Sequence, residues 1–451
     1  MGKKTIFITS FNPFATRNIL FSDVFGILSS RPDWRLVIFC PDYKKDYFEK
    51  NFILRQAQNK KNNVIIEGVK SETASRQDII FSYLGRSLIS TKTLAIHRKE
   101  ILLRNKNPLT FIFSYFLNFI GWFSSIKKLV RSLDYLTISK TKFAVYFDKY
   151  KPDLIFSTDI FHVDDVHFLA EAKSRGVKTV SMIRSWDNIT NKGLFRIEPD
   201  KLIVHNEVIK QEALQYESIG GDNIFVSGMP QFDLYVQRPR IPKAQFFKEV
   251  GLDPDKKTIF VAPHGNRFYQ DDWFLLDFLK ELPYQYIIRL PPNDTVNFSG
   301  FSPTKNFYID DPGQQFKKDV YRDREMDLED STRLADELFY SDLVINYGST
   351  ITVDAVFFDK PAIIVAFDAN ESRPYLKNVR RFLDFSHINK MLKTQCCKIA
   401  YSKSDLVDYI KSYLENPALD KDGRTRLREA QVYRTDGKSG EAIAQFLIQH
   451  L

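Results

Sequence analysis

The chain has 451 residues, of which 43% are hydrophobic, and a formal net charge of +9. A chain of this length is too long to fold around a single hydrophobic core, so we predict two large domains. The hydrophobic content excludes a wholly disordered chain. The three cysteines lack the spacing of a disulfide framework or a zinc site, which favours a reducing cytoplasm. The net charge favours anionic partners such as phosphate-bearing substrates, anionic lipid or nucleic acid.

Short apolar, β-branched runs recur along the chain, separated by segments long enough for helices. Near-continuous runs of this kind are typical of strands in parallel sheets that helices cover on both faces. The runs lie at 5–8, 36–39, 64–66, 154–156, 179–183, 202–204, 224–226, 259–261, 286–288, 307–309, 343–345 and 362–365. The sequence therefore predicts an α/β fold with two Rossmann-like, doubly wound parallel-sheet domains.

The segment 109–123 departs from this pattern because it is apolar nearly all round. Lys127, Lys128 and Arg131 follow it. About fifteen residues is shorter than the roughly twenty that a spanning helix needs, so a true span is the least favoured interpretation. A buried helix and an interfacial helix with its lysines at lipid phosphates both remain open. We treat 109–131 as a membrane-proximal segment.

In a doubly wound sheet, ligands bind at the carboxyl ends of the strands, so polar residues directly after the predicted strands are candidate site residues. In the first half these are Arg17, Asn18, Asp159, Trp186, Asp187 and Asn188, with His162, Asp164 and Asp165 close behind Asp159. The Trp-Asp-Asn loop offers an aromatic platform for a sugar ring beside a carboxylate. Each of these residues could equally serve only as a turn or cap former.

A domain boundary is indicated by the stretch 228–233 and the prolines that follow it. We expect an N-terminal domain over 1–235, a C-terminal domain over 236–435 and a last helix over 436–451 that could pack on either domain. In the second domain, His264 and Arg289 stand at strand ends. The acidic pair Asp253 and Asp255 has a spacing that metal-dependent transferases use, but it lies in a proline turn, so we expect no metal and no cofactor.

The segment 342–365 is the most informative one in the chain. A predicted strand ends at Asn346, a Gly348-Ser349-Thr350 turn follows, and a helix then carries Asp354. Backbone N–H groups at that helix start would suit a diphosphate, and Asp354 could accept hydrogen bonds from ribose hydroxyls. The alternative is that Ser349 or Thr350 only caps the helix.

This segment resembles the donor-binding signature of GT-B glycosyltransferases. Asp354-Ala355 and Pro361 stand at the spacing of that family's Glu-Ala and Pro, whereas Asn346 occupies the position of a second Glu that retaining members carry. The stretches 228–233, 262–265 and 289–292 resemble motifs of the glycerophosphotransferase and surface-polysaccharide glycosyltransferase groups. The resemblance implies a GT-B fold, in which an N-terminal acceptor domain faces a C-terminal nucleotide-sugar donor domain across a cleft.

The resemblance further implies a glycosyltransferase that moves a sugar from a nucleotide-sugar to a glycan or lipid-linked acceptor in surface polysaccharide synthesis. Asn346 favours an inverting or phosphotransfer mechanism, and the turn at 253–255 favours a metal-independent one. His264, Arg289 and the Ser349-Thr350 helix start would stabilise the leaving nucleotide, together with Asn346, Gly348 and Asp354 as the donor site. Asp187, or else Asp159, would be the general base, and Arg17, Asn18, Trp186 and Asn188 would line the acceptor side of the cleft.

Three alternatives remain open. A CDP-alditol phosphotransferase would move glycerol phosphate or ribitol phosphate in the same cleft, and a UDP-sugar 2-epimerase would need no acceptor. A non-enzymatic, basic membrane-surface binding protein is the third. We expect no nucleic-acid partner, because the densest aromatic run lacks interleaved basic residues. The expected location is cytoplasmic, and peripheral at the inner face of the cytoplasmic membrane if 109–131 is interfacial.

Overall fold

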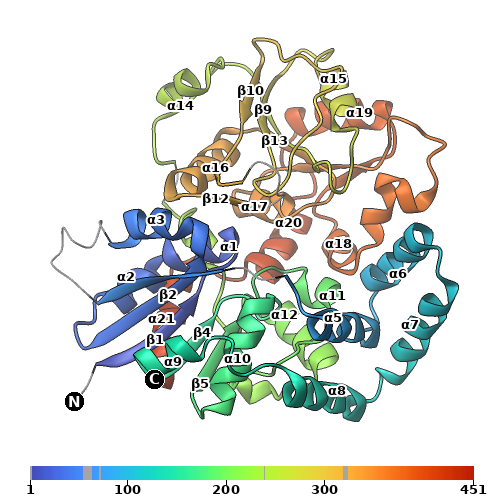
Figure 1. Cartoon of the computed structure of the whole chain (residues 1–451). Helices are drawn as coiled ribbons and strands as arrows, with labels where there is room; N and C mark the ends of the chain where they lie inside the picture. Colours follow the sequence, from blue (N-terminus) through green and yellow to red (C-terminus); the bar gives the residue numbers. More distant parts are fainter. Residues whose placement is uncertain (1–2, 54–62, 71–72, 238, 318–322) are drawn as a thin grey trace. The chain divides into compact units, whose positions relative to one another are not determined.

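The computed structural model describes residues 3–53, 63–70, 73–237, 239–317 and 323–451. The chain divides into two compact units, each built around its own sheet (Figure 1). The first unit comprises Met1–Pro230 together with Lys438–Leu451, and the second comprises Gln231–Gly437. The last helix therefore belongs to the first unit, although its sequence was compatible with either.

Within its described residues, the first unit has a seven-stranded sheet in the order β3-β2-β1-β4-β5-β6-β7, and every neighbouring pair is parallel. Its strands are β1 (Lys4–Thr9), β2 (Trp34–Pro41), β3 (Val64–Val69), β4 (Leu154–Ser157), β5 (Lys178–Met182), β6 (Lys201–Val204) and β7 (Ile224–Val226). The strand order reverses between β1 and β4, which is where a doubly wound sheet usually opens to a ligand.

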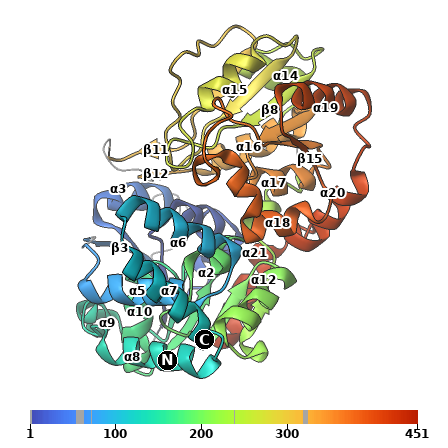
Figure 2. The same ribbon diagram turned by 90° about the vertical axis from the view of Figure 1, so that its right-hand side faces the viewer.

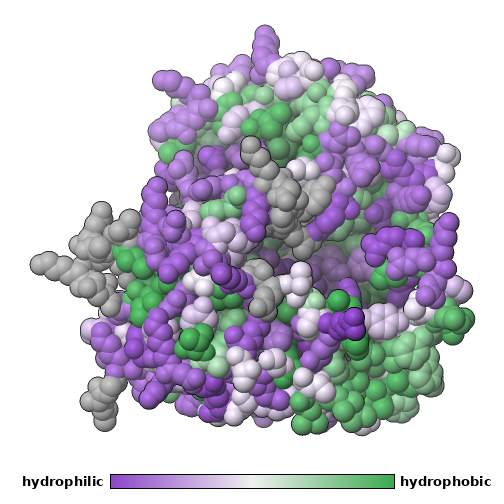
Figure 3. All heavy atoms as spheres, in the orientation of Figure 1, coloured by the Kyte–Doolittle hydropathy of each residue, from purple (hydrophilic) through white to green (hydrophobic). Residues whose placement is uncertain are grey.

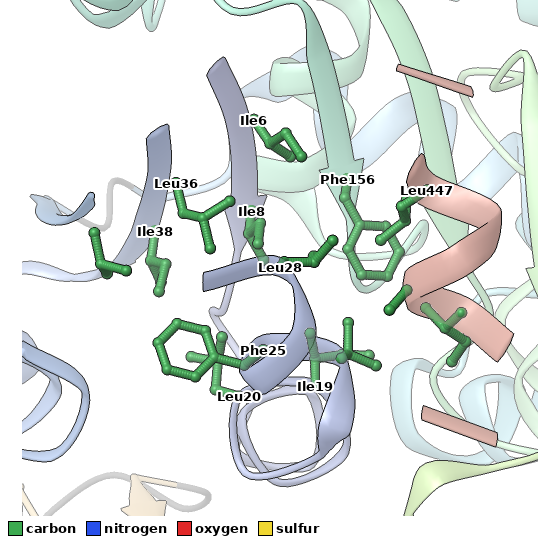
Figure 4. Close-up of a cluster of buried hydrophobic side chains, with 14 of the residues drawn as sticks. Ile6, Ile8, Ile19, Leu20, Phe25, Leu28, Leu36, Ile38, Phe156 and Leu447 are labelled. Atoms are coloured by element: carbon green, nitrogen blue, oxygen red, sulfur yellow. The ribbon is translucent and has the colours of Figure 1, made fainter. Parts of the chain in front are cut away.

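Helices cover both faces of this sheet, since alternate side chains of a strand point to opposite faces. Ile6 and Ile8 of β1 pack with α2 (Asp23–Ser29) and the C-terminal helix α21 (Ser439–His450). Figure 4 shows Leu447 of α21 beside Phe156 in this cluster. Phe7 faces the other way, toward the aromatic residues of α9 (Ala144–Tyr150) and α10 (Val163–Ser174).

Among the described residues, four helices precede α9 in the segment between β3 and β4. They are α5 (Arg76–Leu88), α6 (Lys92–Asn105), α7 (Pro108–Ile120) and α8 (Ser124–Thr137), and α7 packs against both α5 and α6 (Figure 2). Ser75 and Asp78 form a capping box that begins α5. The other helices of this unit are α1 (Pro13–Ala15), η1 (Thr16–Leu20), η2 (Asp42–Lys44), α3 (Lys45–Phe48), η3 (Glu49–Ile53), α11 (Asn188–Lys192), α12 (Glu207–Glu212), η4 (Ala213–Glu217) and η5 (Gly221–Asn223).

The second unit has a six-stranded parallel sheet in its described residues, in the order β10-β9-β8-β13-β14-β15. The strands are β8 (Thr258–Ala262), β9 (Gln285–Arg289), β10 (Phe307–Asp310), β13 (Leu343–Asn346), β14 (Ala362–Val365) and β15 (Lys398–Ala400), beside a small antiparallel pair of β11 (Gln314–Gln315) and β12 (Arg324–Glu325). Its helices are α13 (Pro230–Asp233), α14 (Lys243–Val250), α15 (Asp272–Leu279), α16 (Leu328–Tyr340), α17 (Ile351–Phe357), η6 (Tyr375–Lys377), η7 (Val379–Asp384), α18 (Ser386–Leu392), α19 (Lys403–Glu415), α20 (Lys421–Leu427) and η8 (Arg428–Val432).

The prediction of two parallel-sheet, Rossmann-like units is confirmed. Every apolar run singled out in the sequence forms a strand, and one core of the second unit packs α14 and α16 against β8, β9 and β13. The strands β11, β12 and β15 were missed. They are two or three residues long and do not read as apolar runs, so no periodic pattern marks them.

Candidate active site

In the first unit, two carboxylates and an arginine meet at the carboxyl ends of β4 and β5. Asp159 follows β4, and its carboxylate forms an ion pair with Arg184, which follows β5. Asp165 lies in the first turn of α10 and accepts hydrogen bonds from the hydroxyls of Thr9 and of Ser157, the latter at 2.8 Å. This group therefore sits where the strand order of the sheet reverses.

Asp165 is fully buried, and its environment favours the neutral acid. Burial raises the pKa of Asp165 to about 8, and the nearby charge of Asp159 adds to the shift, while the hydroxyls of Thr9 and Ser157 oppose it. Its second oxygen, Oδ2, lies 3.5 Å from Nδ1 of His162. Asp165 is thus a group that holds or releases a proton near neutral pH.

The Trp186-Asp187-Asn188 loop lies at the start of α11. The side-chain amides of Asn188 and Asn191 each donate to one carboxylate oxygen of Asp187, both over 3.2 Å. These bonds hold the carboxylate in a defined orientation. The ring of Trp186 is buried, so little of its surface forms the open aromatic platform that the sequence suggested.

Arg17 and Asn18 lie after β1 in the short helix η1, rather than in a loop. Both are buried, and Nε of Arg17 donates to Oδ1 of Asn18 at 3.2 Å. The structure thus brings Asp159 together with Arg184 and Asp165, and Asp187 together with Asn188. Arg184 was missed, although its place directly after a predicted strand is the signal that identified its neighbours.

In the second unit, Asn346 organises the turn after β13. Its Oδ1 accepts hydrogen bonds from the backbone N–H groups of Gly348 at 2.7 Å and Ser349 at 2.9 Å. These two N–H groups are therefore engaged within the protein, whereas the sequence suggested that they were open to an anion. Gly348 has a φ of +82°, a conformation that side chains other than glycine's rarely adopt. Thr350 stands at the N-cap of α17 without a side-chain capping bond.

Asp354 is buried, and it is hydrogen-bonded to residues that precede β8, the first strand of the second unit. Its Oδ1 accepts from the amide of Gln231 at 2.6 Å and from the hydroxyl of Tyr235 at 2.9 Å. This carboxylate therefore connects α17 to the residues that begin the second unit. The sequence interpretation, in which it accepts hydrogen bonds from a ribose, did not include these partners.

His264 stands at the carboxyl end of β8, half-buried among aromatic rings. Its ring centroid lies 4.2 Å from that of Phe382 and 5.9 Å from that of Tyr347. Burial lowers the pKa of His264 to about 3, and the charges of Arg381 and Arg267 add to the shift. The imidazole is therefore neutral at physiological pH and serves as a hydrogen-bonding group rather than as a cation.

Arg289, at the end of β9, is buried in an ion-pair network. Its guanidinium lies 2.6 Å from Asp310 and 2.8 Å from Glu337, and it donates to the backbone oxygen of Asp330 at 2.7 Å. This network neutralises the charge that the sequence interpretation directed at a leaving phosphate. Of the cations that act on His264, Arg381 in η7 has the larger electrostatic effect and Arg267 the smaller.

Arg381 was missed by the sequence analysis. It is buried, and it donates to the backbone oxygens of Asn378 at 2.8 Å and Phe268 at 3.1 Å, which places a fixed cation beside the loop after β8. The hydroxyl of Ser349 is buried, and among the described residues it has no hydrogen-bond partner. The irregular segment after β14 has no periodicity, so the only signal that could have marked Arg381 in the sequence is its adjacency to Arg380.

Asp253 and Asp255 lie in a turn, where the backbone N–H of Asp255 donates to Oδ1 of Asp253 at 3.0 Å. Among the described residues, no group of three or more His, Cys, Asp or Glu side chains is arranged to hold a metal ion.

One protein family matches the sequence over residues 187–449, which is more than half of the chain. It is the CDP-Glycerol:Poly(glycerophosphate) glycerophosphotransferase family. The chain belongs to this family. The glycerophosphotransferase family fits the phosphotransferase alternative better than the sugar transfer that we expected first. No curated protein matches the chain in sequence.

Solved structures share the fold of this family member at low sequence identity. A UDP-GlcNAc 2-epimerase from Neisseria meningitidis, bound to UDP-GlcNAc, is 13% identical with a TM-score of 0.55, over 99% of this chain and 100% of that one. A variant of the wall teichoic acid polymerase TagF, soaked with CDPG, is 15% identical with a TM-score of 0.52, over 99% of this chain and 88% of that one. The expected GT-B-like fold is thus confirmed.

Proposed function

We propose that this protein transfers glycerol phosphate, or a related alditol phosphate, from a CDP-linked donor to a hydroxyl group of a phosphate-containing cell-wall polymer. The observation that carries the proposal is the family match over residues 187–449, which includes the whole second unit. The fold that the chain shares with a TagF structure soaked with CDPG is compatible with a cytidine nucleotide as donor.

The reaction exchanges one bond at phosphorus for another. The acceptor oxygen bonds to the phosphorus that carries the glycerol, the bond from that phosphorus to the bridging oxygen breaks, and CMP leaves with the electron pair. The hydroxyl proton passes to a base. The product is a phosphodiester, and no further reactant is required.

In the second unit, Arg381, Ser349 and His264 form the donor site of this proposal. Negative charge develops on the leaving CMP, and a fixed cation stabilises such charge more effectively than a mobile one, because it needs no reorganisation. Arg381 supplies that cation. The Ser349 hydroxyl and the neutral imidazole of His264 supply hydrogen bonds to phosphate oxygens.

In the first unit, Asp187 is the proposed general base. The amides of Asn188 and Asn191 orient its carboxylate, as a base requires when it must reach one hydroxyl proton. Asp159 is less suited to this role, because the guanidinium of Arg184 already neutralises it. Arg184 and Asp159 orient the acceptor in this proposal.

The nucleotide product separates this proposal from its rivals. With CDP-glycerol and a glycerophosphate polymer, we expect CMP and a polymer longer by one glycerophosphate. A nucleoside diphosphate formed from a nucleotide-sugar would indicate sugar transfer instead. Free sugar and nucleotide formed without an acceptor would indicate an epimerase. Chromatography of the nucleotides and mass spectrometry of the polymer distinguish all three.

Variants test the assigned roles. The variant Asp187→Asn should turn over about 10²- to 10⁴-fold more slowly, because it lacks the proton acceptor. Its affinity for the CDP-linked donor should be unchanged. Asp148→Asn is the matched control, since the Asp148 side chain is 70% exposed and outside the site. Turnover by Asp187→Asn at the rate of this control would remove Asp187 from the mechanism.

A further inference from the structure

The first unit presents two areas of opposite chemical character. The outward faces of α7 and α8 are apolar, and Figure 3 shows this hydrophobic area at the lower right of the molecule. The interpretation of 109–123 as a buried helix is therefore wrong, and among the described residues no single helix is long and apolar enough to cross a membrane. The carboxyl ends of β4 and β5 instead carry the polar group around Asp165. A phosphate-bearing ligand needs hydrogen-bond donors, which only the second area supplies.

His162 stands in the turn that joins β4 to α10. Its backbone N–H donates to the carbonyl oxygen of Asp159 at 2.9 Å. Its ring stacks on that of Phe11, with the ring centroids 5.2 Å apart and an angle of 14° between the planes. The side chain is 32% exposed. The imidazole is thus held in place by two separate contacts while part of it remains accessible.

The contacts of Nδ1 decide the tautomer of His162. This nitrogen accepts a hydrogen bond from the backbone N–H of Asp164 at 3.3 Å, which caps α10. A ring nitrogen that accepts a hydrogen bond carries no proton, so the proton of the neutral imidazole is on Nε2. Burial lowers the pKa of His162; Asp164 and Asp159 oppose this shift, and Arg184 and Lys142 add to it. The ring is therefore neutral near pH 7 and has an N–H donor at Nε2.

Asp165 faces the same nitrogen of His162. Its Oδ2 lies 3.5 Å from Nδ1, and its Oδ1 accepts from the hydroxyls of Thr9 and Ser157. Oδ2 is buried and has no hydrogen-bond partner in the part of the chain that the structure describes. Two acceptors would repel each other at this distance, whereas a proton on Oδ2 allows it to donate toward Nδ1. The geometry therefore agrees with the neutral acid that the raised pKa of Asp165 favours.

The charges around His162 balance when Asp165 is neutral. Asp159 pairs with Arg184, and Asp164 pairs with a lysine at 2.9 Å. An ionised Asp165 would add an uncompensated negative charge and repel an anion. With its proton in place, the group offers the N–H of His162 without a net negative charge beside it.

We infer that the Nε2–H group of His162 binds an anionic phosphodiester oxygen of the acceptor polymer, and that Asp165 is the positioning residue that holds His162 in this tautomer. Nε2 has no protein partner among the described residues. His162 lies in the first unit, as do the residues proposed to bind the acceptor, whereas the proposed donor site is in the second unit. The identity of the acceptor rests on the proposed function, but the tautomer does not. A phosphate of the donor has the same chemistry, so the experiments separate the two sources.

Nitrogen-15 NMR of the full-length protein, labelled at histidine, tests the tautomer directly. Comparison with His162→Gln identifies the signals of His162 among those of the seven histidines. We expect a neutral ring protonated at Nε2 at pH 7, whose signals move when a trimer of glycerol phosphate is added and do not move with CDP-glycerol. A ring that is charged or protonated at Nδ1 would overturn the inference, and signals that move only with CDP-glycerol would assign His162 to the donor instead.

Calorimetric binding of the trimer, with CMP present to fill the nucleotide site, tests the donor at Nε2. His162→Phe keeps a ring to stack on Phe11 but lacks the N–H group. It should bind the trimer about ten- to a hundredfold more weakly, as expected for a hydrogen bond to a charged group. His162→Gln has an amide that donates from a similar position and should recover most of the affinity. His450→Phe, which changes a histidine that packs on Phe446 in α21, is the matched control and should bind like the wild type.

Two calorimetric results would overturn the assignment of His162 to the acceptor. One is a wild type that does not bind the trimer, and the other is equal affinity of His162→Phe and the wild type. A wild type that binds the trimer through His162 but releases no CMP from CDP-glycerol would refute the transfer reaction and leave this inference standing. The two failures are therefore distinguishable.

The pH dependence of trimer binding tests the role of Asp165. Burial and the charge of Asp159 raise the pKa of Asp165 to about 8, so the affinity of the wild type should fall as the pH rises through this value. In Asp165→Asn the amide donates toward Nδ1 at every pH, so its affinity should stay constant over the same range. A purely structural role would change the melting temperature without removing this pH dependence. An equal fall in affinity for both proteins would overturn the positioning role of Asp165.

Discussion

At the scale of single residues, the strand ends carry polar groups whose behaviour depends on burial. The side-chain oxygen of Asn346 accepts hydrogen bonds from two backbone N–H groups, and these bonds shape the turn after β13. Asp165 is surrounded by two hydroxyls and by the charge of Asp159, and desolvation keeps its proton bound. An asparagine on the surface would hydrogen-bond to water instead, and an exposed aspartate would be hydrated and would lose its proton at its ordinary pKa.

Asp165 should make the stability of the first unit fall as the pH rises. Its pKa is about 8 when folded and near the ordinary 3.8 when unfolded, so between these values the folded state binds the additional proton. Each pH unit in this window lowers the free energy of unfolding by about 1.4 kcal/mol, which amounts to about 4 kcal/mol between pH 5 and pH 8.

The variant Asp165→Asn cannot titrate and should lack this dependence. Urea unfolding of wild type and variant at several pH values measures the difference directly, and Asp148→Asn provides an exposed carboxylate as control. Equal slopes of unfolding free energy against pH for all three proteins would show that Asp165 is ionised in the folded state.

At the scale of elements, the lack of a side chain at Gly121 allows the end of α7 to approach the backbone of Leu88 closely. A Cβ added at Gly121 would lie 2.0 Å from the backbone oxygen of Leu88, which is far inside contact distance. At Gly26 in α2, by contrast, an added Cβ would meet nothing within 4 Å. The two glycines therefore have opposite roles, although both are in or next to a helix.

Alanine substitutions at these glycines should change stability in opposite directions. Gly121→Ala should destabilise the protein by about 3 kcal/mol or displace the end of α7, because the backbone of Leu88 cannot yield as a flexible side chain does. Gly26→Ala should stabilise it by about 0.5–1 kcal/mol, since alanine loses less conformational entropy in a helix. Thermal unfolding of both variants checks this, and similar shifts in melting temperature would contradict the close approach at Gly121.

At the scale of the whole molecule, the chain returns to its first unit at the end. Residues 231–437 form the second unit, and α21 then completes a core that begins with β1. Ile443, Ala444 and Leu447 of α21 are fully buried there, and Phe446 stacks on Phe225 of β7 at 4.3 Å. The first unit is therefore continuous in space but discontinuous in sequence.

Truncation after Gly437 should unfold the first unit selectively. Removing several buried apolar side chains costs about 2–5 kcal/mol each, which approaches the total stability of a typical domain. The second unit keeps all of its own core. Hydrogen exchange with mass spectrometry should show loss of protection in β1 to β7 and retention in β8 to β15. Equal loss in both units would indicate that they unfold as one, and Tyr433→Ala, an exposed position just before the cut, serves as control.

Local patterns in the sequence were enough to predict the strands and the two parallel sheets, because continuous apolar runs mark buried strands. The same patterns indicated candidate site residues at the strand ends, but only the tertiary structure shows which partners those residues contact. In the sequence, Arg289 and Asp354 both appear available to bind a ligand. In the structure, Arg289 pairs with Glu337 and Asp310. Asp354 accepts hydrogen bonds from Gln231 and Tyr235, which are more than a hundred residues away in the chain. The sequence likewise left open whether Lys127 and Arg131 face lipid or protein, and both are bonded to groups inside the first unit. Whether a charged side chain is already paired within the protein depends on which residues contact it in the folded structure. The spacing of residues in the sequence does not show contacts between segments that are far apart in the chain.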